Sequence, residues 1–299
     1  MSFTKELKEE ILQKEQGKDC CNLAELAGII AFSSTIKNGY LKITIENKFV
    51  ARRIVKLLKR LLDIQAGIEV KAGGGVRKND TFIISVREFA KLLNGISMIN
   101  KEGSLCFPQK SAENPCCKKA FIKGAFLGGG SMSHPQKRYH LEFVTHYPEI
   151  CEGFNLFLED MEFAAKAVER KGKFVTYFKD CDSICNLLAI AGASLGVMKI
   201  YQEKVYKDKK NEINRLNNSE VANIMKTVTA STDQRACIEK IQRTAGLESL
   251  PESLKKLAEV RLKYPDDGLA QLGARLNPPI GKSGVNHRMR KIIEISKRY

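Results

Sequence analysis

An internal repeat limits the possible folds of this chain more strongly than any other feature. The segment CCNLAELAGIIAFSSTI, residues 20–36, is matched 96 positions later by CCKKAFIKGAFLGGGSM, residues 116–132. Both segments begin with two adjacent cysteines, continue as an apolar, helix-like run and share an alanine and a glycine position. A chain that repeats itself in this way is expected to fold as two related halves.

The two copies also agree in the order of their expected elements. In each copy a strand with alternating apolar and polar residues follows the first helix, and a second helix follows that strand. Two strands around a turn then lead to a short final helix. After the first helices, the elements are expected at 40–47, 48–63, 81–86 and 87–97 in the first copy and at 138–145, 148–172, 173–178 and 182–194 in the second.

Small residues share one face of each first helix. Ala24 and Gly28 are four positions apart, as are Ala120, Gly124 and Gly128, so each set lies on one side of its helix. Such small side chains let two helices approach backbone to backbone. Two crossed copies would form a pseudo-twofold body with its sheets side by side, whereas the alternative is an ordinary core contact of small residues.

The stretches LAGIIAFSS (26–34) and FIKGAFLGGGSM (121–132) resemble the LAGLIDADG motif of homing endonucleases. The resemblance implies two such helices at the centre of a saddle of β-sheets that lies on DNA. It also implies an acidic residue at the end of each helix, because carboxylate oxygens hold the divalent metal beside the scissile phosphates.

The acidic positions of that motif are not acidic in this chain. Ser33 and Gly129 stand at the metal-binding positions, and Ala31 and Leu127 stand at the other acidic position. Glu25 comes too early in its helix to replace them. We therefore expect a scaffold that keeps its shape but has no catalytic residues, no bound metal and no enzymatic activity.

The charge balance of the chain points to a polyanionic partner. It has 50 lysines and arginines against 34 acidic residues, a formal net charge of +16 and a pI near 9.4. Nucleic acid is the first expectation, and an anionic membrane surface is the alternative. No apolar run approaches the roughly 20 residues that span a bilayer, and the charged N-terminal residues do not resemble a secretory signal, so we expect a cytoplasmic protein.

The helix expected at 48–63 is strongly basic. Its apolar stripe, Ile54, Leu57, Leu58 and Leu61, predicts that the cations lie on the outer face. There they either contact phosphates or are simply solvated. These cations are Arg52, Arg53, Lys56, Lys59 and Arg60.

The nine cysteines include two vicinal pairs, at 20–21 and 116–117, but no C-x-x-C motif. Adjacent cysteines rarely bridge each other, and a cytosolic chain keeps its thiols reduced. Cys181 and Cys185 have no second ligand pair near them in the sequence. We interpret the cysteines as small buried apolar residues and expect neither a zinc site nor any other cofactor.

The chain becomes helical from about residue 204 onward. Residues 204–218 are rich in charge and are interpreted as a linker. A helix capped by Asn218 or Ser219 is expected to follow. It should bury three apolar residues at helical spacing, which are Val221, Ile224 and Val228.

Residues 266–299 predict a helix-turn-helix. Asp266 and Asp267 can cap a short helix, and the two prolines of NPPIG (277–281) must end it. A last helix follows with Ser283 as its cap, and a second helix of this kind lies in the major groove of DNA. A generic helical hairpin is the alternative. The apolar stripe of the last helix consists of Val285, Met289, Ile292 and Ile293.

The polar face of the last helix carries residue types that read DNA. Arginine pairs well with guanine and asparagine with adenine, while lysines and helix N-termini suit phosphates. His287 would read a base or would simply be solvated. The candidate DNA-binding residues are Lys282, Ser283, Asn286, His287, Arg288, Arg290 and Lys291.

The segment LAQLGARLNPPIGKSGVNHRMRKI (269–292) closely resembles the C-terminal signature of the WhiA family of Gram-positive bacteria. That family joins a degenerate two-repeat LAGLIDADG domain to a helix-turn-helix domain, and NEINRLNNSEVANIMKTVTAS (211–231) resembles the joining segment. The resemblance implies a DNA-binding protein that controls transcription in sporulation, cell division or chromosome segregation. For actinobacterial members it also implies a small iron–sulfur partner of the WhiB type.

We therefore expect an α+β fold with a two-repeat LAGLIDADG-like saddle over 1–203 (repeats at about 20–98 and 116–195), a linker over 204–218 and an all-α helix-turn-helix domain over 219–299. The expected function is that of a non-catalytic, sequence-specific regulator that binds double-stranded DNA in the nucleoid, with a regulatory protein as a further partner. We expect no membrane contact and no small-molecule substrate. The alternatives are a nucleoid-associated protein with little sequence preference and a nuclease with unconventional metal ligands.

Overall fold

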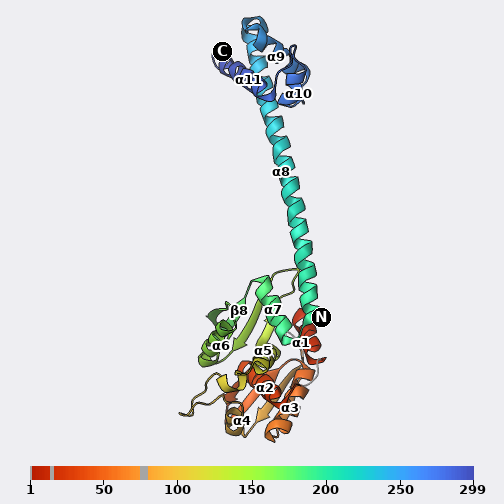
Figure 1. Cartoon of the computed structure of the whole chain (residues 1–299). Helices are drawn as coiled ribbons and strands as arrows, with labels where there is room; N and C mark the ends of the chain where they lie inside the picture. The colour runs from red at the N-terminus through yellow and green to blue at the C-terminus, as the bar shows by residue number, and fades with distance from the viewer. Residues whose placement is uncertain (1, 14–16, 75–79) are drawn as a thin grey trace. The chain divides into compact units, whose positions relative to one another are not determined.

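The computed structural model describes residues 2–13, 17–74 and 80–299 (Figure 1). The chain folds into two compact units, Met1–Tyr206 and Lys207–Tyr299. The first unit combines helices with two β-sheets, and the second contains only helices and their connections. The α+β class expected from the sequence is confirmed.

The first unit contains the same seven elements twice, which confirms the internal repeat. Each copy has a central helix, a hairpin, a helix, a second hairpin and a short helix, in that order. The first copy consists of α2 (Asp19–Ser33), β1 (Ser34–Lys37), β2 (Tyr40–Ile45), α3 (Lys48–Leu62), β3 (Gly67–Lys71), β4 (Thr81–Val86) and α4 (Phe89–Gly95). The second consists of α5 (Pro115–Gly129), β5 (Gly130–Met132), β6 (Leu141–Thr145), α6 (Pro148–Asp160), β7 (Lys166–Arg170), β8 (Lys173–Phe178) and α7 (Cys181–Ala191).

Each copy forms one antiparallel sheet of four strands with the same strand order. The orders are β1-β2-β4-β3 and β5-β6-β8-β7. Ile43 on β2 lies opposite Ile84, and Phe143 on β6 lies opposite Thr176. The alternation that predicts β2 and β6 therefore produces sheets with one buried face, because successive side chains of a strand point to opposite sides.

The first hairpin of each copy is absent from the sequence-based expectation. β1 and β2 are joined by Asn38 and Gly39, whose φ angles are 52° and 74°. Two positive φ angles are typical of the two-residue turn that joins antiparallel strands, and Asn-Gly is its strongest sequence signal. That dipeptide could have predicted β1. The equivalent β5 is only three residues long and carries no comparable signal.

The helix expected over 148–172 is wrong in its second half. α6 ends at Asp160, and Lys166–Arg170 form β7, which pairs with β8. Lys171 and Gly172 join these strands with φ angles of 53° and 70°. This turn matches the twist of the strands and favours a hairpin over a continued helix.

The central helices α2 and α5 lie side by side in the middle of the first unit (Figure 1). A Cβ atom added to Gly124 would lie 2.0 Å from the backbone oxygen of Glu25, and one added to Gly28 would lie 2.4 Å from that of Phe121. Gly128 approaches Ile29 in the same way. The backbone-to-backbone contact expected from the small residues is thus confirmed.

An N-terminal helix, α1 (Phe3–Gln13), packs on the first unit through Phe3, Leu7 and Ile11. The Glu10 carboxylate accepts hydrogen bonds from the backbone N–H groups of Leu195 and Gly196, at 2.7 and 3.0 Å. These N–H groups belong to the first turn of α8 (Ser194–Thr244) and have no partner within the helix. Glu10 therefore caps the start of α8.

The long helix α8 differs from the organisation expected around residue 218. Residues 204–218, interpreted as a linker, are helical and lie within α8, and no new helix starts at Asn218 or Ser219. Every residue from 208 to 230 is exposed. The prediction that Val221, Ile224 and Val228 are buried is therefore wrong, because periodicity shows which residues share a face but not whether another element covers it. Among the described helices, none combines the length and the apolar character needed to cross a membrane.

The cysteine interpretation is correct for only part of the set. The Cys20 and Cys116 side chains are exposed, so the interpretation is wrong for both. Their pairs occupy the first turns of α2 and α5, whose side-by-side packing brings all four sulfur atoms together. The cysteines that are buried as expected are Cys117, Cys151, Cys181 and Cys185.

The second unit has its own apolar core. It contains the end of α8, α9 (Glu252–Lys263), α10 (Leu269–Ala274), α11 (Lys282–Ser296) and the short 3-10 helix η2 (Leu247–Ser249). All the buried residues of this core belong to the second unit. Its fully buried members include Ile238, Ile241, Leu257, Leu272 and Val285.

Candidate nucleic-acid interface

The helices α10 and α11 are joined by a tight turn that folds back on α10. The Ile280 N–H donates a hydrogen bond to the Gly273 carbonyl at 3.1 Å. A Cβ atom at residue 273 would lie 2.1 Å from the Ile280 oxygen, so only glycine allows this approach. The helix-turn-helix arrangement expected for residues 266–299 is confirmed.

One face of α11 is fixed by the core of the second unit. Val285, Met289 and Ile292 are buried, as predicted, while Ile293 is half-buried. Because residues four positions apart share a helix face, the opposite face of α11 points to solvent. That orientation leaves a basic helix surface free for a ligand.

The predicted DNA-binding residues differ in exposure, and not all of them lie on this outer face. Asn286 and Arg288 are half-buried, and Arg288 Nη1 donates a hydrogen bond to the Ser253 carbonyl of α9 at 3.5 Å. Arg288 is thus partly engaged within the protein. The fully exposed members of the set are Lys282, Ser283, His287, Arg290 and Lys291.

The start of α11 differs from the prediction. Gly281 is the N-cap, and Ser283 lies inside the first turn without capping the helix through its side chain. Its hydroxyl therefore projects from the first turn beside backbone N–H groups that lack helical partners. These donors suit an anion such as a phosphate.

The start of α10 also differs from the prediction. Gly268 is its N-cap, and the Gln271 side chain accepts a hydrogen bond from the Gly268 N–H at 2.8 Å. Asp267 instead pairs with Arg275, whose guanidinium lies 3.8 Å from the centre of the Tyr264 ring. The expected cap by Asp266 or Asp267 is thus replaced by a glycine cap.

A buried arginine fixes the loop between α9 and α10. Arg261 is only 2% exposed and donates hydrogen bonds to the carbonyls of Pro265 and Asp267, at 3.3 and 2.7 Å. Its burial lowers the pKa of the guanidinium. The sequence does not distinguish Arg261 from its neighbours, because a single arginine in a charged helix carries no sign that it points inward.

The last residues of α2 and α5, where an endonuclease would hold its metal, are not acidic. The helices end at Ser33 and Gly129, the positions the motif predicts. The Ser33 hydroxyl donates to the Ile29 carbonyl at 2.6 Å, and a side chain on Gly129 would collide with the carbonyls of Phe32 and Val144. No hard oxygen ligand is therefore supplied by the motif positions themselves.

A lysine lies at the end of α5 instead. Lys8 of α1 donates a hydrogen bond from Nζ to the Leu127 carbonyl at 3.0 Å. This carbonyl belongs to the last turn of α5, where helix carbonyls carry partial negative charge. Burial lowers the pKa of Lys8 to about 8. The protonated amine supplies a positive charge at the end of the helix and would repel a divalent cation there.

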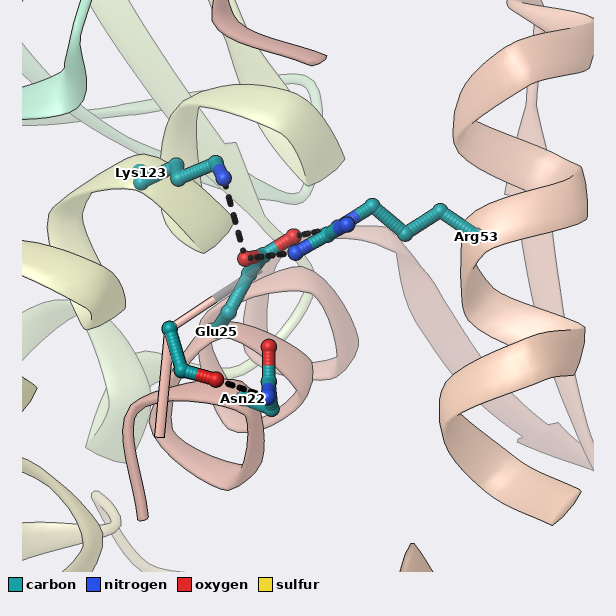
Figure 2. Close-up of polar contacts among 5 residues, drawn as sticks. Asn22, Glu25, Arg53 and Lys123 are labelled. Carbon is teal, nitrogen blue, oxygen red and sulfur yellow. Dashed lines mark hydrogen bonds and ion pairs between the residues drawn. The ribbon is translucent and has the colours of Figure 1, made fainter. Parts of the chain in front are cut away.

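Glu25 is the acidic residue of α2 closest in sequence to the end of that helix, but its carboxylate forms ion pairs with residues of other helices. Figure 2 shows its carboxylate between Arg53 of α3 and Lys123 of α5, and it is buried. Arg53 Nη2 donates to Glu25 at 2.7 Å, its Nε donates to the second carboxylate oxygen, and Lys123 Nζ lies 3.2 Å from Glu25. Arg53 therefore faces the interior, which corrects its expected placement on the outer face of the basic helix.

The fold and these sites define a class of protein. It is a two-repeat LAGLIDADG-like scaffold without the motif's acids, joined to a helix-turn-helix. Three family models match the chain. They are the WhiA N-terminal LAGLIDADG-like domain over 19–97, the WhiA LAGLIDADG-like domain over 118–210 and the WhiA C-terminal HTH domain over 213–296. The chain belongs to the WhiA family.

Its relatives span the whole chain. A probable cell division protein WhiA from Alkaliphilus metalliredigens is 39% identical over 311 residues, covering 100% of this chain and 98% of the relative. A probable cell division protein WhiA from Clostridium botulinum is 38% identical over 308 residues, which cover 99% of this chain and 98% of that relative. The structural match to the crystal structure of full-length WhiA from Thermatoga maritima covers 100% of this chain and 99% of the Thermatoga chain, with 25% sequence identity and a TM-score of 0.60.

Proposed function

We propose that this protein is a non-catalytic regulator that binds double-stranded DNA in a sequence-specific manner through α11. The observation that carries the proposal is the orientation of α11, whose apolar face is buried in the core of the second unit. Its opposite face carries exposed arginine and lysine side chains at the position of a recognition helix. The net charge of +16 adds attraction to a polyanion.

The exposed residues divide into two roles. Arg290 and His287 read base edges, and half-buried Asn286 reads adenine where it reaches the groove. Lys282, Lys291 and the Ser283 hydroxyl contact phosphates and fix the register of α11 on the duplex. Arg288 contributes less than Arg290, since its guanidinium already bonds the Ser253 carbonyl.

The first unit serves as a scaffold without nuclease activity. Its motif positions lack carboxylates and Lys8 places an ammonium at the end of α5, so the metal-dependent reaction lacks its ligands. It adds affinity for DNA or receives a regulatory protein. The relatives are named probable cell division proteins, and we assign this protein to the control of cell division in the nucleoid.

The test starts from the full-length protein and random genomic fragments. Fragments retained by the protein are sequenced, and binding to a recovered site is compared with binding to a shuffled duplex by fluorescence anisotropy. A specific regulator keeps a preference of roughly 10³-fold or more. A preference near one would instead support the alternative of a nucleoid protein with little sequence preference. The affinity should also fall with salt, at a log–log slope of about −0.9 per neutralised phosphate.

The absence of nuclease activity has a separate test. Purified protein is incubated with supercoiled plasmid in the presence of Mg²⁺ or Mn²⁺, and the topology is followed on a gel. We expect no nicking above a protein-free control. Metal-dependent nicking that co-purifies with the protein would restore the nuclease alternative.

A further inference from the structure

Two vicinal cysteine pairs from different repeats meet in the first unit. Cys20 and Cys21 lie in the first turn of α2, and Cys116 and Cys117 lie in the first turn of α5. The four sulfur atoms all lie within 4.8 Å of one another. Because the pairs are 96 residues apart in sequence, only the packing of α2 on α5 brings them together.

The role of apolar filler does not explain this cluster. A cysteine that only fills a core is buried, but Cys20 and Cys116 are exposed, Cys21 is half-buried and Cys117 is buried. All four are free thiols. The cluster therefore lies at the surface with one side open to solvent, where a ligand can enter.

The spacing of the sulfur atoms suits a single tetrahedral metal ion. In a tetrahedral zinc site with Zn–S bonds of about 2.3 Å, the sulfur atoms lie about 3.8 Å apart. The sulfurs of Cys20 and Cys21 are 4.0 Å apart, and those of Cys116 and Cys117 are 3.9 Å apart. Small side-chain rotations would close the wider separations between the two pairs.

The size and softness of the site select the ion. Thiolates favour zinc, copper(I) and iron–sulfur clusters over hard cations. An iron–sulfur cluster holds its thiolates farther apart than a single ion does, because several irons and sulfides lie between them. Four protein sulfurs in a tetrahedral arrangement are typical of structural zinc, so the spacing favours Zn²⁺.

The first turns of two helices converge on the cluster, and the N–H groups and dipoles of helix N-termini attract negative charge. Burial acts in the opposite direction and raises the pKa of Cys21 and of Cys117, so a metal ion must displace their protons. The acidic residue in the first turn of α2, Asp19, is paired with Arg60, so its charge is partly neutralised.

We propose that Cys20, Cys21, Cys116 and Cys117 bind one Zn²⁺ ion that joins the two repeats at the N-terminal ends of α2 and α5. As the four Zn–S bonds form, the four thiol protons pass to solvent. All four ligands come from the protein, so the site is structural rather than catalytic. Each helix has 15 residues and is about 22 Å long, so the site is far from the helix ends where endonucleases hold their metal.

The test uses the full-length chain, reduced and freed of metal. Zn²⁺ is titrated against a chromophoric chelator, and Co²⁺ is used as a spectroscopic substitute. We expect one ion per chain, and the visible and near-ultraviolet absorption of tetrahedral cobalt with four thiolate ligands. Zn²⁺ should also raise the melting temperature, because an ion that binds only the folded state stabilises it.

Matched double variants separate this cluster from the other thiols. Cys20→Ser/Cys116→Ser removes the two exposed ligands and should weaken Zn²⁺ affinity on the order of 100-fold or more, because the closed site loses half its sulfurs. Cys106→Ser/Cys237→Ser removes two half-buried thiols outside the cluster and should leave affinity and the cobalt spectrum unchanged. Circular dichroism checks that both variants are folded.

Alkylation of the native chain gives a readout that needs no variant. Mass spectrometry follows the alkylation of the nine cysteines in the chain. Zn²⁺ should protect the four cysteines of the cluster from alkylation. The proposal is overturned if the folded chain binds no stoichiometric Zn²⁺, if the control variant loses affinity equally, or if Zn²⁺ protects none of the four. Disulfides between the pairs on mild oxidation, without Zn²⁺ binding, would identify a redox site instead. None of these readouts depends on DNA binding.

Discussion

At the scale of single residues, the side chains that matter most are those whose direction the sequence does not reveal. Glu25 is an ordinary helix residue in the sequence, yet its carboxylate is 3% exposed and contacts two cations from other helices. Arg53 belongs by sequence to a basic surface, yet it points inward. An amphipathic pattern leaves the residues at the border of the apolar stripe undecided, and Arg53 is one of these.

The Glu25 contacts predict a large effect of one substitution. Glu25→Gln keeps the shape but leaves Arg53 and Lys123 without their shared counter-charge in a buried place, which should lower the free energy of unfolding by about 3 kcal/mol or more. Urea denaturation measures the change. Glu69→Gln breaks an exposed pair with Lys71 and should cost about 0.5 kcal/mol or less. Equal effects of the two variants would contradict a structural role for Glu25.

Lys8 predicts a pH dependence whose sign follows from its lowered pKa. The folded pKa is about 8, below the value of about 10.4 expected in the unfolded chain. Burial penalises the charged form, so Lys8 destabilises the fold below pH 8, and this effect disappears as the pH rises to about 10.4. The stability of the native chain relative to Lys8→Met should therefore increase between pH 8 and 10.4. Urea denaturation of both at several pH values checks this, and a constant difference would contradict the lowered pKa.

Arg290 predicts an effect on specificity. If it contacts guanine, Arg290→Ala should cost about 1–3 kcal/mol of binding free energy at the specific site and relax the preference at one base pair. Lys240→Ala removes one exposed positive charge from α8 and serves as the charge-matched control. Fluorescence anisotropy on specific and shuffled duplexes measures both variants. A uniform loss on all duplexes would assign Arg290 to phosphate contact.

At the scale of elements, the contact between α2 and α5 is the feature that the sequence predicts best. The spacing of small residues indicates one face, and the internal repeat supplies the second helix for that face. The same two helices also show the limit of pattern reasoning. Their first turns carry the cysteine pairs, and the sequence shows each pair separately without showing that they meet.

The crossing predicts a sharp cost for a small added side chain. Gly124→Ala places a methyl group 2.0 Å from the Glu25 carbonyl oxygen, so the backbones must separate, and the free energy of unfolding should fall by about 3 kcal/mol or more. Gly67→Ala adds the same methyl group on β3, where the nearest atom is 4.0 Å away, and should be close to neutral. Denaturation curves compare the variants. An unaffected Gly124→Ala protein would contradict the paired-helix contact.

At the scale of the whole molecule, the chain has two cores, one in each unit. The exposed stretch of α8 at 208–230 belongs to neither. A helix without tertiary contacts is held only by its own hydrogen bonds, and it opens more easily than packed helices do.

Limited proteolysis tests this arrangement. Trypsin should cut first between Lys207 and Arg215, because opening of this exposed helix disturbs neither core. Mass spectrometry should find two fragments that persist while the intact chain disappears. Lys119, exposed on the packed helix α5, provides an internal control that should be cut slowly. Early cleavage at Lys119 or rapid loss of either fragment would contradict two independent cores.

Local patterns along the chain were sufficient to identify the repeat, the crossing face of the central helices, the loss of the motif's acids and the helix-turn-helix. These features depend on the spacing of residues within one element or on the similarity between two segments. Both can be read directly from the sequence. The exposure of Val221, the inward direction of Arg53 and the meeting of Cys20 with Cys116 depend on which element packs against which. The helical period determines which residues share one side of a helix. Which element covers that side depends on the packing of the complete chain.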